Sequence, residues 1–276
     1  MRNSRQQTPR RDCPHGTSPQ AAQPNQYSLG KILLIWVSVT APMALLSGWA
    51  APFLIPRIDL NPGLIYWWLM IVGMMWQTVV AFLVLRSEDQ RWTIGALKQR
   101  LWLQTPRQPS GTPNRALYGW VILGILFVAL TSDLLGERID APFQALFPSL
   151  TLPDYANIKN LAAPEFHGQW GILGIALVSC LFNYILGEAL LFHCVLLPKM
   201  EGVFGRWAWL ANGTLFGLYH VHLIGALPSI ILSNLAYSWP AQRYRSNWLA
   251  VLIHGFEGVV LLAIVLWVIL GSGSTI

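Results

Sequence analysis

Residues 187–222 read GEALLFHCVLLPKMEGVFGRWAWLANGTLFGLYHVH. It consists of two apolar segments joined by a short polar turn. Each segment carries ionisable residues: Glu188 and His193 in the first, His220 and His222 in the second. Ionisable side chains are costly in hydrocarbon, so in membrane helices they face the protein interior or a water-filled cavity. The stretch therefore predicts membrane helices that enclose a functional site.

Composition supports the same fold class. Of the 276 residues, 54% are hydrophobic and 11% are charged, whereas soluble domains average about 25% charged residues. Apolar runs of about twenty residues recur, and at about 1.5 Å per residue each run can cross the hydrocarbon of a bilayer. We expect an all-α integral membrane protein with about seven transmembrane helices, the last four forming the core. The expected spans are Ile32–Ile55, Leu64–Leu85, Ala116–Leu135, Gln169–Leu197, Trp207–Leu223, Ile224–Trp239 and Trp248–Leu270.

The spans divide the chain into two parts. Residues 1–29 are polar, basic and rich in Pro, Gln and Ser, and we expect a disordered arm there. Residues 30–276 form the polytopic membrane domain. Cys13 and His15 lie in the arm, but two potential ligands are too few for a structural metal site.

Basic residues predict the orientation in the lipid bilayer. They occur in the arm and in residues 86–115, 199–206 and 243–245, which fall on one side of a seven-span protein, while the acid-leaning connection 136–168 falls on the other. Because basic connections favour the cytoplasmic side, we expect a cytoplasmic N-terminus. The compact chain suits a bacterial plasma membrane. No nucleic-acid partner is expected, since the basic residues flank apolar runs instead of forming a surface patch.

Three ionisable residues in separate spans are predicted to lie at similar depths in the membrane. Counted from the ends of their spans, Glu188, His220 and His254 lie roughly 15, 20 and 10 Å below the inner face. A buried carboxylate beside histidines suits a general base that takes a proton from water. The histidines could hold a metal ion or stabilise an oxyanion. The alternative is a structural pair, in which Glu188 contacts a histidine only to avoid an isolated buried charge.

Three short motifs resemble those of the CAAX protease and bacteriocin-processing (CPBP, or Abi) family of intramembrane metalloproteases. GEALLFHCVLLPKM is similar to the family pattern E-E-x-x-x-R, FGLYH to F-x-x-x-H and LIHGFEG to H-x-x-x-N/D, within a resemblance that covers about residues 169–270. The resemblance implies an endopeptidase that hydrolyses a peptide or membrane-protein substrate within the membrane. Glu188 would then activate water, Phe216 and His220 would supply the second motif, and His254 the third. It also implies a zinc ion held by Glu188, His220 and His254.

The chain departs from the family pattern at three positions. Ala189 stands in place of the second glutamate, His193 in place of the arginine and Gly258 in place of Asn or Asp. Ala189 and His193 are four residues apart, where Glu and Arg would form an ion pair on one helix face. Removing both partners of a buried pair can be neutral, so these two departures are interpreted as a paired replacement. His193 could instead act as a cation or ligand near the site, and Glu257 could substitute for the side chain missing at Gly258.

These departures keep other functions open. The first alternative is a catalytically inactive family member that binds a peptide or partner protein, for example in immunity. The second is a small transporter in which intramembrane acids and histidines relay protons. The chain has no recognisable duplicated half, which argues against the transporter.

Overall fold

The computed structural model describes residues 25–88, 92–157, 161 and 163–271. The α-helices are α1 (Leu29–Leu45), α2 (Ala51–Leu54), α3 (Pro62–Ser87), α4 (Ile94–Arg100), α5 (Gly119–Val128), α6 (Gly136–Leu146), α7 (Gly171–Leu181), α8 (Glu201–Phe204), α9 (Ala208–Tyr219), α10 (Leu227–Arg243) and α11 (Asn247–Ile269). Short 3-10 segments are η2 (Ile55–Arg57), η3 (Arg115–Tyr118), η5 (Asp154–Ala156), η7 (Pro164–Phe166), η10 (Leu197–Lys199), η11 (Gly205–Trp207) and η12 (Val221–Ala226). Four segments have π-helical hydrogen bonding: η1 (Leu46–Ala50), η4 (Ala129–Leu134), η8 (Phe182–Leu186) and η9 (Ala189–Leu196).

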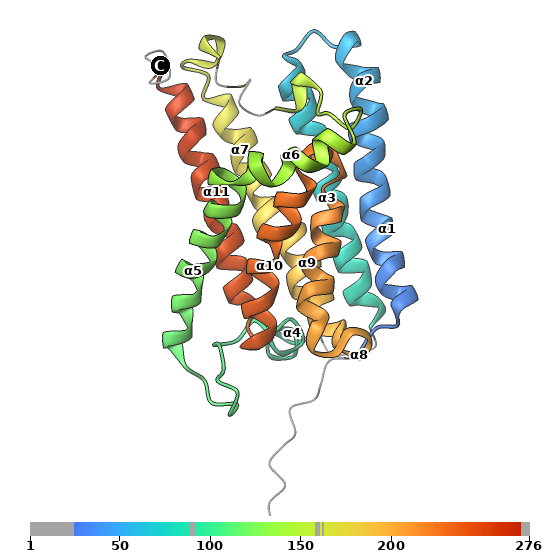
Figure 1. Ribbon diagram of the computed structural model, residues 1–276, viewed down its shortest axis with the longest axis vertical. Helices are drawn as coiled ribbons and strands as arrows, with labels where there is room; N and C mark the ends of the chain where they lie inside the picture. Colours follow the sequence, from blue (N-terminus) through green and yellow to red (C-terminus); the bar gives the residue numbers. More distant parts are fainter. Residues whose placement is uncertain (1–24, 89–91, 158–160, 162, 272–276) are drawn as a thin grey trace, which may run out of the picture.

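Six helical stretches in the described part of the chain are long and apolar enough to cross a membrane. They are Leu29–Arg57, Pro62–Ser87, Arg115–Leu134, Gly171–Lys199, Val221–Arg243 and Asn247–Ile269. This confirms the all-α integral membrane fold that the sequence predicts. Figure 1 shows the long helices packed as rods along one axis, with α1 against α3 and with α11 against α5 and α7.

The remaining expected span, Trp207–Leu223, takes a different form. Its helix α9 has 12 residues, which at about 1.5 Å per residue cover about 18 Å, less than the roughly 30 Å of bilayer hydrocarbon. The chain then turns through η12, where Leu223 has non-helical backbone angles, and returns as α10 beside α9. Residues 208–243 therefore form a helical hairpin. Irregular backbone at membrane depth is tolerated where protein buries it or where it lines a cavity.

Helix α6 covers the closed end of this hairpin (Figure 1). The buried carboxylate of Asp140 accepts hydrogen bonds from the backbone N–H of Ser229, at 2.9 Å, and from its hydroxyl, at 2.8 Å. Ser229 lies in the first turn of α10, where backbone N–H groups have no partner within the helix. A residue of α6 thus caps α10 and fixes the hairpin turn.

The basic connections gather at one end of the bundle, which we call the basic end. There α1, α5 and α11 begin, α3 and α10 end, and α4 and α8 lie (Figure 1). At this end the buried carboxylate of Glu88 accepts hydrogen bonds from Tyr27 and Arg100 and lies 2.6 Å from the Nζ atom of Lys199. Burial alone would raise the pKa of Glu88, but hydrogen bonds from these partners outweigh burial and hold the pKa below its ordinary value. The four residues, named here the Glu88 cluster, join α3, α4, η10 and the segment before α1. Residues 1–24 of the predicted arm lie outside the described residues.

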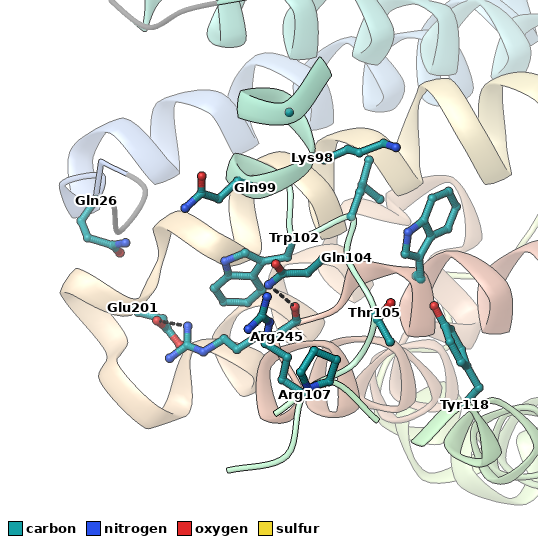
Figure 2. Close-up of a pocket in the computed structure, with 14 residues that line it drawn as sticks. Gln26, Lys98, Gln99, Trp102, Gln104, Thr105, Arg107, Tyr118, Glu201 and Arg245 are labelled. Carbon is teal, nitrogen blue, oxygen red and sulfur yellow. Dashed lines mark hydrogen bonds and ion pairs between the residues drawn. The ribbon is translucent and has the colours of Figure 1, made fainter. Parts of the chain in front are cut away.

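A pocket of about 860 Å³ opens at the basic end (Figure 2). Figure 2 shows Arg245 beside Trp102 and directed toward Glu201, with which it forms an ion pair. Trp102 and Arg245 both adopt positive φ angles, 50° and 51°. Gln104 donates a hydrogen bond to the carbonyl of Arg245 at 3.1 Å, which helps to hold this conformation. None of the predicted site residues lines this pocket.

Candidate active site

The membrane span that carries Glu188 is interrupted just before this residue. Gly187 separates η8 from η9 and has backbone angles of φ −94° and ψ −91°. A Cβ atom at this position would lie 2.3 Å from the carbonyl oxygen of Phe182 and 2.7 Å from that of Met74. Gly187 therefore allows the backbone of α3 to approach closely. π-helical interruptions of this kind occur frequently at functional sites.

The interruption directs Glu188 toward two histidines on other elements. The carboxylate atom Oε2 lies 3.8 Å from Nε2 of His220 and 3.8 Å from Nε2 of His254. His220 follows the last residue of α9, and His254 lies in α11. Glu188 and His254 are each 3% exposed. All three line one cavity of about 320 Å³, so the structure brings the three predicted catalytic residues together.

The hydrogen bond of His220 indicates its tautomer. Its Nδ1 atom lies 2.8 Å from the backbone carbonyl of Phe216. A carbonyl only accepts, so Nδ1 carries the proton, and a neutral His220 presents a lone pair on Nε2 toward Glu188. This suits His220 to accept a hydrogen bond from water inside the cavity.

Comparison with known families supports the motif resemblance. Residues 168–260 match the sequence model of the family described as type II CAAX prenyl endopeptidase Rce1-like. Over this segment the chain is similar to the Rce1-like, or CPBP, family. The matched residues run from just before α7 into α11 and include Glu188, His220 and His254. Comparisons with curated proteins and with solved structures give no match.

The first two departures from the family motif lie behind the cavity. Ala189 and His193 are both completely buried, and neither lines the cavity. The ring of His193 lies 5.6 Å from that of His254 and 5.2 Å from that of Phe216. The ring of Phe216 in turn lies 5.0 Å from His220. His193 and Phe216 therefore help to position the imidazoles and do not face the reacting groups.

The third departure is explained by Tyr184, which lies outside the three sequence motifs. A Cβ atom on Gly258 would lie 2.6 Å from the ring of Tyr184. The same ring packs edge-on against His254 with a centroid distance of 4.9 Å. Tyr184 thus fills the space that a side chain at position 258 would need. No short motif could reveal this, because the contact depends on how η8 packs against α11.

Glu257 provides a second carboxylate in the cavity. It lines the same cavity as Glu188, and its carboxylate accepts a hydrogen bond from the hydroxyl of Tyr237 on α10. Tyr237 is buried and also contacts the ring of His254 at 5.1 Å. The secondary candidate Glu257 is therefore held beside the site by a residue that the motifs do not include.

The sequence predicts a zinc ion held by Glu188, His220 and His254. In the part of the chain that the structure describes, no group of three or more His, Cys, Asp or Glu side chains could hold a metal ion as placed. Zinc requires ligand atoms about 2.0–2.2 Å from the metal. As placed, Glu188, His220 and His254 do not form such a group, and the chemistry below involves their own acid, base and hydrogen-bonding groups. Zinc binding stays a prediction.

Proposed function

We propose that this protein is an intramembrane endopeptidase that hydrolyses a peptide bond with water activated by Glu188. The observation that carries the proposal is the carboxylate of Glu188 facing His220 and His254, at 3.8 Å from each, inside one cavity. The separation is longer than a direct hydrogen bond and is compatible with a water molecule that bridges the groups. The similarity of residues 168–260 to the Rce1-like family supports a peptide substrate.

The proposed reaction moves one proton through Glu188. The carboxylate takes a proton from water while the water oxygen attacks the carbonyl carbon of the peptide bond. Nε2 of His220 accepts a hydrogen bond that orients this water, and Nε2–H of His254 stabilises the oxyanion. The C–N bond then breaks, and Glu188 transfers its proton to the leaving amine. The products are a carboxylic acid and an amine.

Replacement of Glu188 tests this mechanism directly. We expect Glu188→Gln and Glu188→Ala to lower the cleavage rate about 10²- to 10⁴-fold, because the base is lost. Rates would be measured on the purified full chain in detergent micelles with a library of unmodified and prenylated peptides. Glu137→Gln changes an exposed carboxylate on α6 and is the matched control. Undiminished cleavage by both Glu188 variants would exclude the mechanism.

The second candidate function is peptide or partner binding without cleavage. It is favoured by Tyr184, whose ring fills the position of the family's third polar side chain. The triple variant Ala189→Glu, His193→Arg and Gly258→Asn separates the two functions, combined with Tyr184→Ala to make room. Cleavage only in the restored protein would favour an inactive native chain. Cleavage by the native chain that depends on Glu188 would favour the endopeptidase.

Zinc binding can be tested independently of activity. Metal analysis of the purified chain would support the prediction if about one zinc per chain were lost in His220→Ala and retained in His167→Ala. His167 lies just before α7 and does not line the cavity. A cleaving enzyme without zinc would contradict it.

We also propose an orientation with the basic end in the cytoplasm of a bacterial cell and the protein in its plasma membrane. Most basic residues of the described connections lie at the end where α4 and α8 are found (Figure 1), whereas Arg57 in η2 and Arg138 in α6 lie toward the opposite end. Basic connections are retained on the cytoplasmic side during insertion.

A further inference from the structure

The active-site cavity extends in one direction from Glu188. On α3 its lining residues run from Met74 through Met70 and Tyr66 to Gly63, at the end of α3 opposite to the basic end. From Met74 to Gly63 the helix rises about 16 Å. Every step along this wall therefore leads away from the basic connections.

The other walls of the cavity also extend toward the end of the molecule opposite to the basic end. On α11 the lining runs from His254 through Glu257 to Leu261, toward the end of the helix that is far from the basic end (Figure 1). Tyr155 and Leu161, from the connection between α6 and α7, complete the wall. No residue of the connections 92–115, 199–207 or 243–247 lines this cavity. Solvent exposure of the lining residues increases toward the same end of the molecule. Glu188 is buried, whereas Gly63, Tyr155 and Leu161 are partly exposed.

The opposite route, from Glu188 to the basic end, is filled. The chain runs from Glu188 through η9 and η10 to Lys199, and every residue from Leu191 to Met200 is buried. Phe192, Leu196 and Leu197 are completely inaccessible, and the ring of Phe192 lies 4.6 Å from that of Phe216. These apolar side chains form a packed layer below the site.

The Glu88 cluster closes the layer at the basic end. Lys199 is completely buried, and its ion pair with Glu88 joins η10 to the end of α3. The backbone N–H of Tyr27 donates to the carbonyl of Lys199 at 2.9 Å, which fastens the segment before α1 across the same place. A peptide that approaches from the basic end would have to break this cluster and displace the apolar layer.

We propose that the active site receives its peptide from the side opposite to the basic end, which is the extracytoplasmic side. The inference rests on the proposed function and on the proposed orientation, and it names the substrate class. The substrate is a peptide segment exposed on the outer face, in a secreted or membrane-anchored protein. A prenylated C-terminus carried by a cytoplasmic protein would meet the closed end of the molecule.

Cysteine labelling from each side of the membrane tests the proposal without any need for turnover. The starting protein is the full chain with Cys13, Cys180 and Cys194 replaced by serine. Two variants of it each carry a single cysteine: Leu223→Cys in the cavity and Leu161→Cys at the mouth of the cavity. Both positions line the cavity and are partly exposed. Val203→Cys, on α8 and 40% exposed, is the control at the basic end. A membrane-impermeant methanethiosulfonate reagent would be applied to right-side-out and inverted membrane vesicles.

We expect Leu223→Cys and Leu161→Cys to react in right-side-out vesicles and to lose this labelling in inverted ones, with Val203→Cys showing the reverse. Labelling of Leu223→Cys from the same side as Val203→Cys would overturn the proposal, as would no labelling of Leu223→Cys from either side. Labelling of Val203→Cys from the outer side would overturn the orientation and the proposal with it. Labelling needs no turnover, so Glu188→Gln should give the same labelling pattern as the native glutamate. The expected labelling pattern, together with a native chain that cleaves none of the peptides, would leave the opening intact and remove the peptidase.

Discussion

At the residue scale, Gly187 is the position where the site depends most directly on the absence of a side chain. A Cβ atom there would overlap two backbone carbonyl oxygens, and no rotamer change can move backbone atoms away. We expect Gly187→Ala to lower stability by about 1–3 kcal/mol or more and to reduce cleavage, because Glu188 must shift. Gly255→Ala is the matched control, since its Cβ would have no heavy atom within 4 Å. The apparent melting temperature in detergent measures the difference, and equal values for the two variants would contradict the prediction.

At the same scale, part of the candidate active site could be predicted from the sequence. Motif spacing and helix depth place Glu188, His220 and His254 near one another, and the structure has all three lining one cavity. The sequence could not indicate that Nδ1 of His220 is bound by the Phe216 carbonyl, because this depends on side-chain rotation at the end of α9. It could not reveal Tyr184 either, since that ring reaches the site only through packing between helices.

At the element scale, the cap that Asp140 provides to α10 should stabilise the hairpin turn beside His220. Asp140→Ala would leave the backbone N–H and hydroxyl of Ser229 without this acceptor. We expect a loss of about 0.5–2 kcal/mol, the usual cost of removing a helix cap. Glu137→Ala, an exposed change on the same helix, should alter stability by less than about 0.5 kcal/mol. Thermal unfolding of both variants measures this, and an equal effect would show that the cap contributes nothing.

The Glu88 cluster should be the strongest polar connection between elements at the basic end. Glu88→Ala would leave Lys199 and Arg100 buried without their carboxylate, and breaking a buried pair in this way costs about 3–5 kcal/mol. Glu201→Ala removes the partner of Arg245 in an ion pair whose side chains are 22% and 47% exposed, and should cost about 0–1 kcal/mol. Apparent melting temperatures of the two variants would be compared in the same detergent. A loss in Glu88→Ala no larger than that in Glu201→Ala would show that the cluster is not a strong connection.

The pKa of Glu88 predicts how this connection responds to acid. Its folded-state pKa lies below the ordinary value of 4.5, so the carboxylate is favoured in the folded protein. The stabilisation is therefore complete at pH values above 4.5 and is lost as the pH falls through the lowered folded-state pKa. We expect the melting temperature of the native chain to fall more steeply below pH 4.5 than that of Glu88→Gln. Parallel pH profiles would show that another group controls acid stability.

Element boundaries also show what the sequence could not determine. Apolar runs predict the spans that match α1, α3, α5, α7, α10 and α11, because about twenty apolar residues in a row have few other structures available. The run from Trp207 to Leu223 looks equally apolar, but its helix ends at Tyr219. The hydropathy of the sequence does not predict the turn after α9, because this turn depends on the hydrogen bond that Asp140 of α6 accepts from Ser229. The hairpin therefore emerges only from the packed structure.

At the scale of the whole molecule, the hairpin has no effect on the predicted orientation. Whether residues 208–243 cross the bilayer twice or enter and return on one side, α9 begins and α10 ends at the basic end. The last helix, α11, therefore starts from the basic end and finishes at the other end in either case. The orientation predicted from the basic connections is consequently the same for either number of complete crossings.

This orientation predicts where reporter enzymes fused to the chain will be active. Alkaline phosphatase fused after Gly271, just beyond α11, should be active, because it folds only outside the cytoplasm and the proposed orientation puts this end of α11 on the extracytoplasmic side. The same enzyme fused after Ser110, in the exposed connection at the basic end, should be inactive, since this connection stays in the cytoplasm. Green fluorescent protein at the same two positions should give the opposite pattern. Phosphatase activity after Ser110 together with none after Gly271 would show that the protein is inverted, and the active-site cavity would then open toward the cytoplasm.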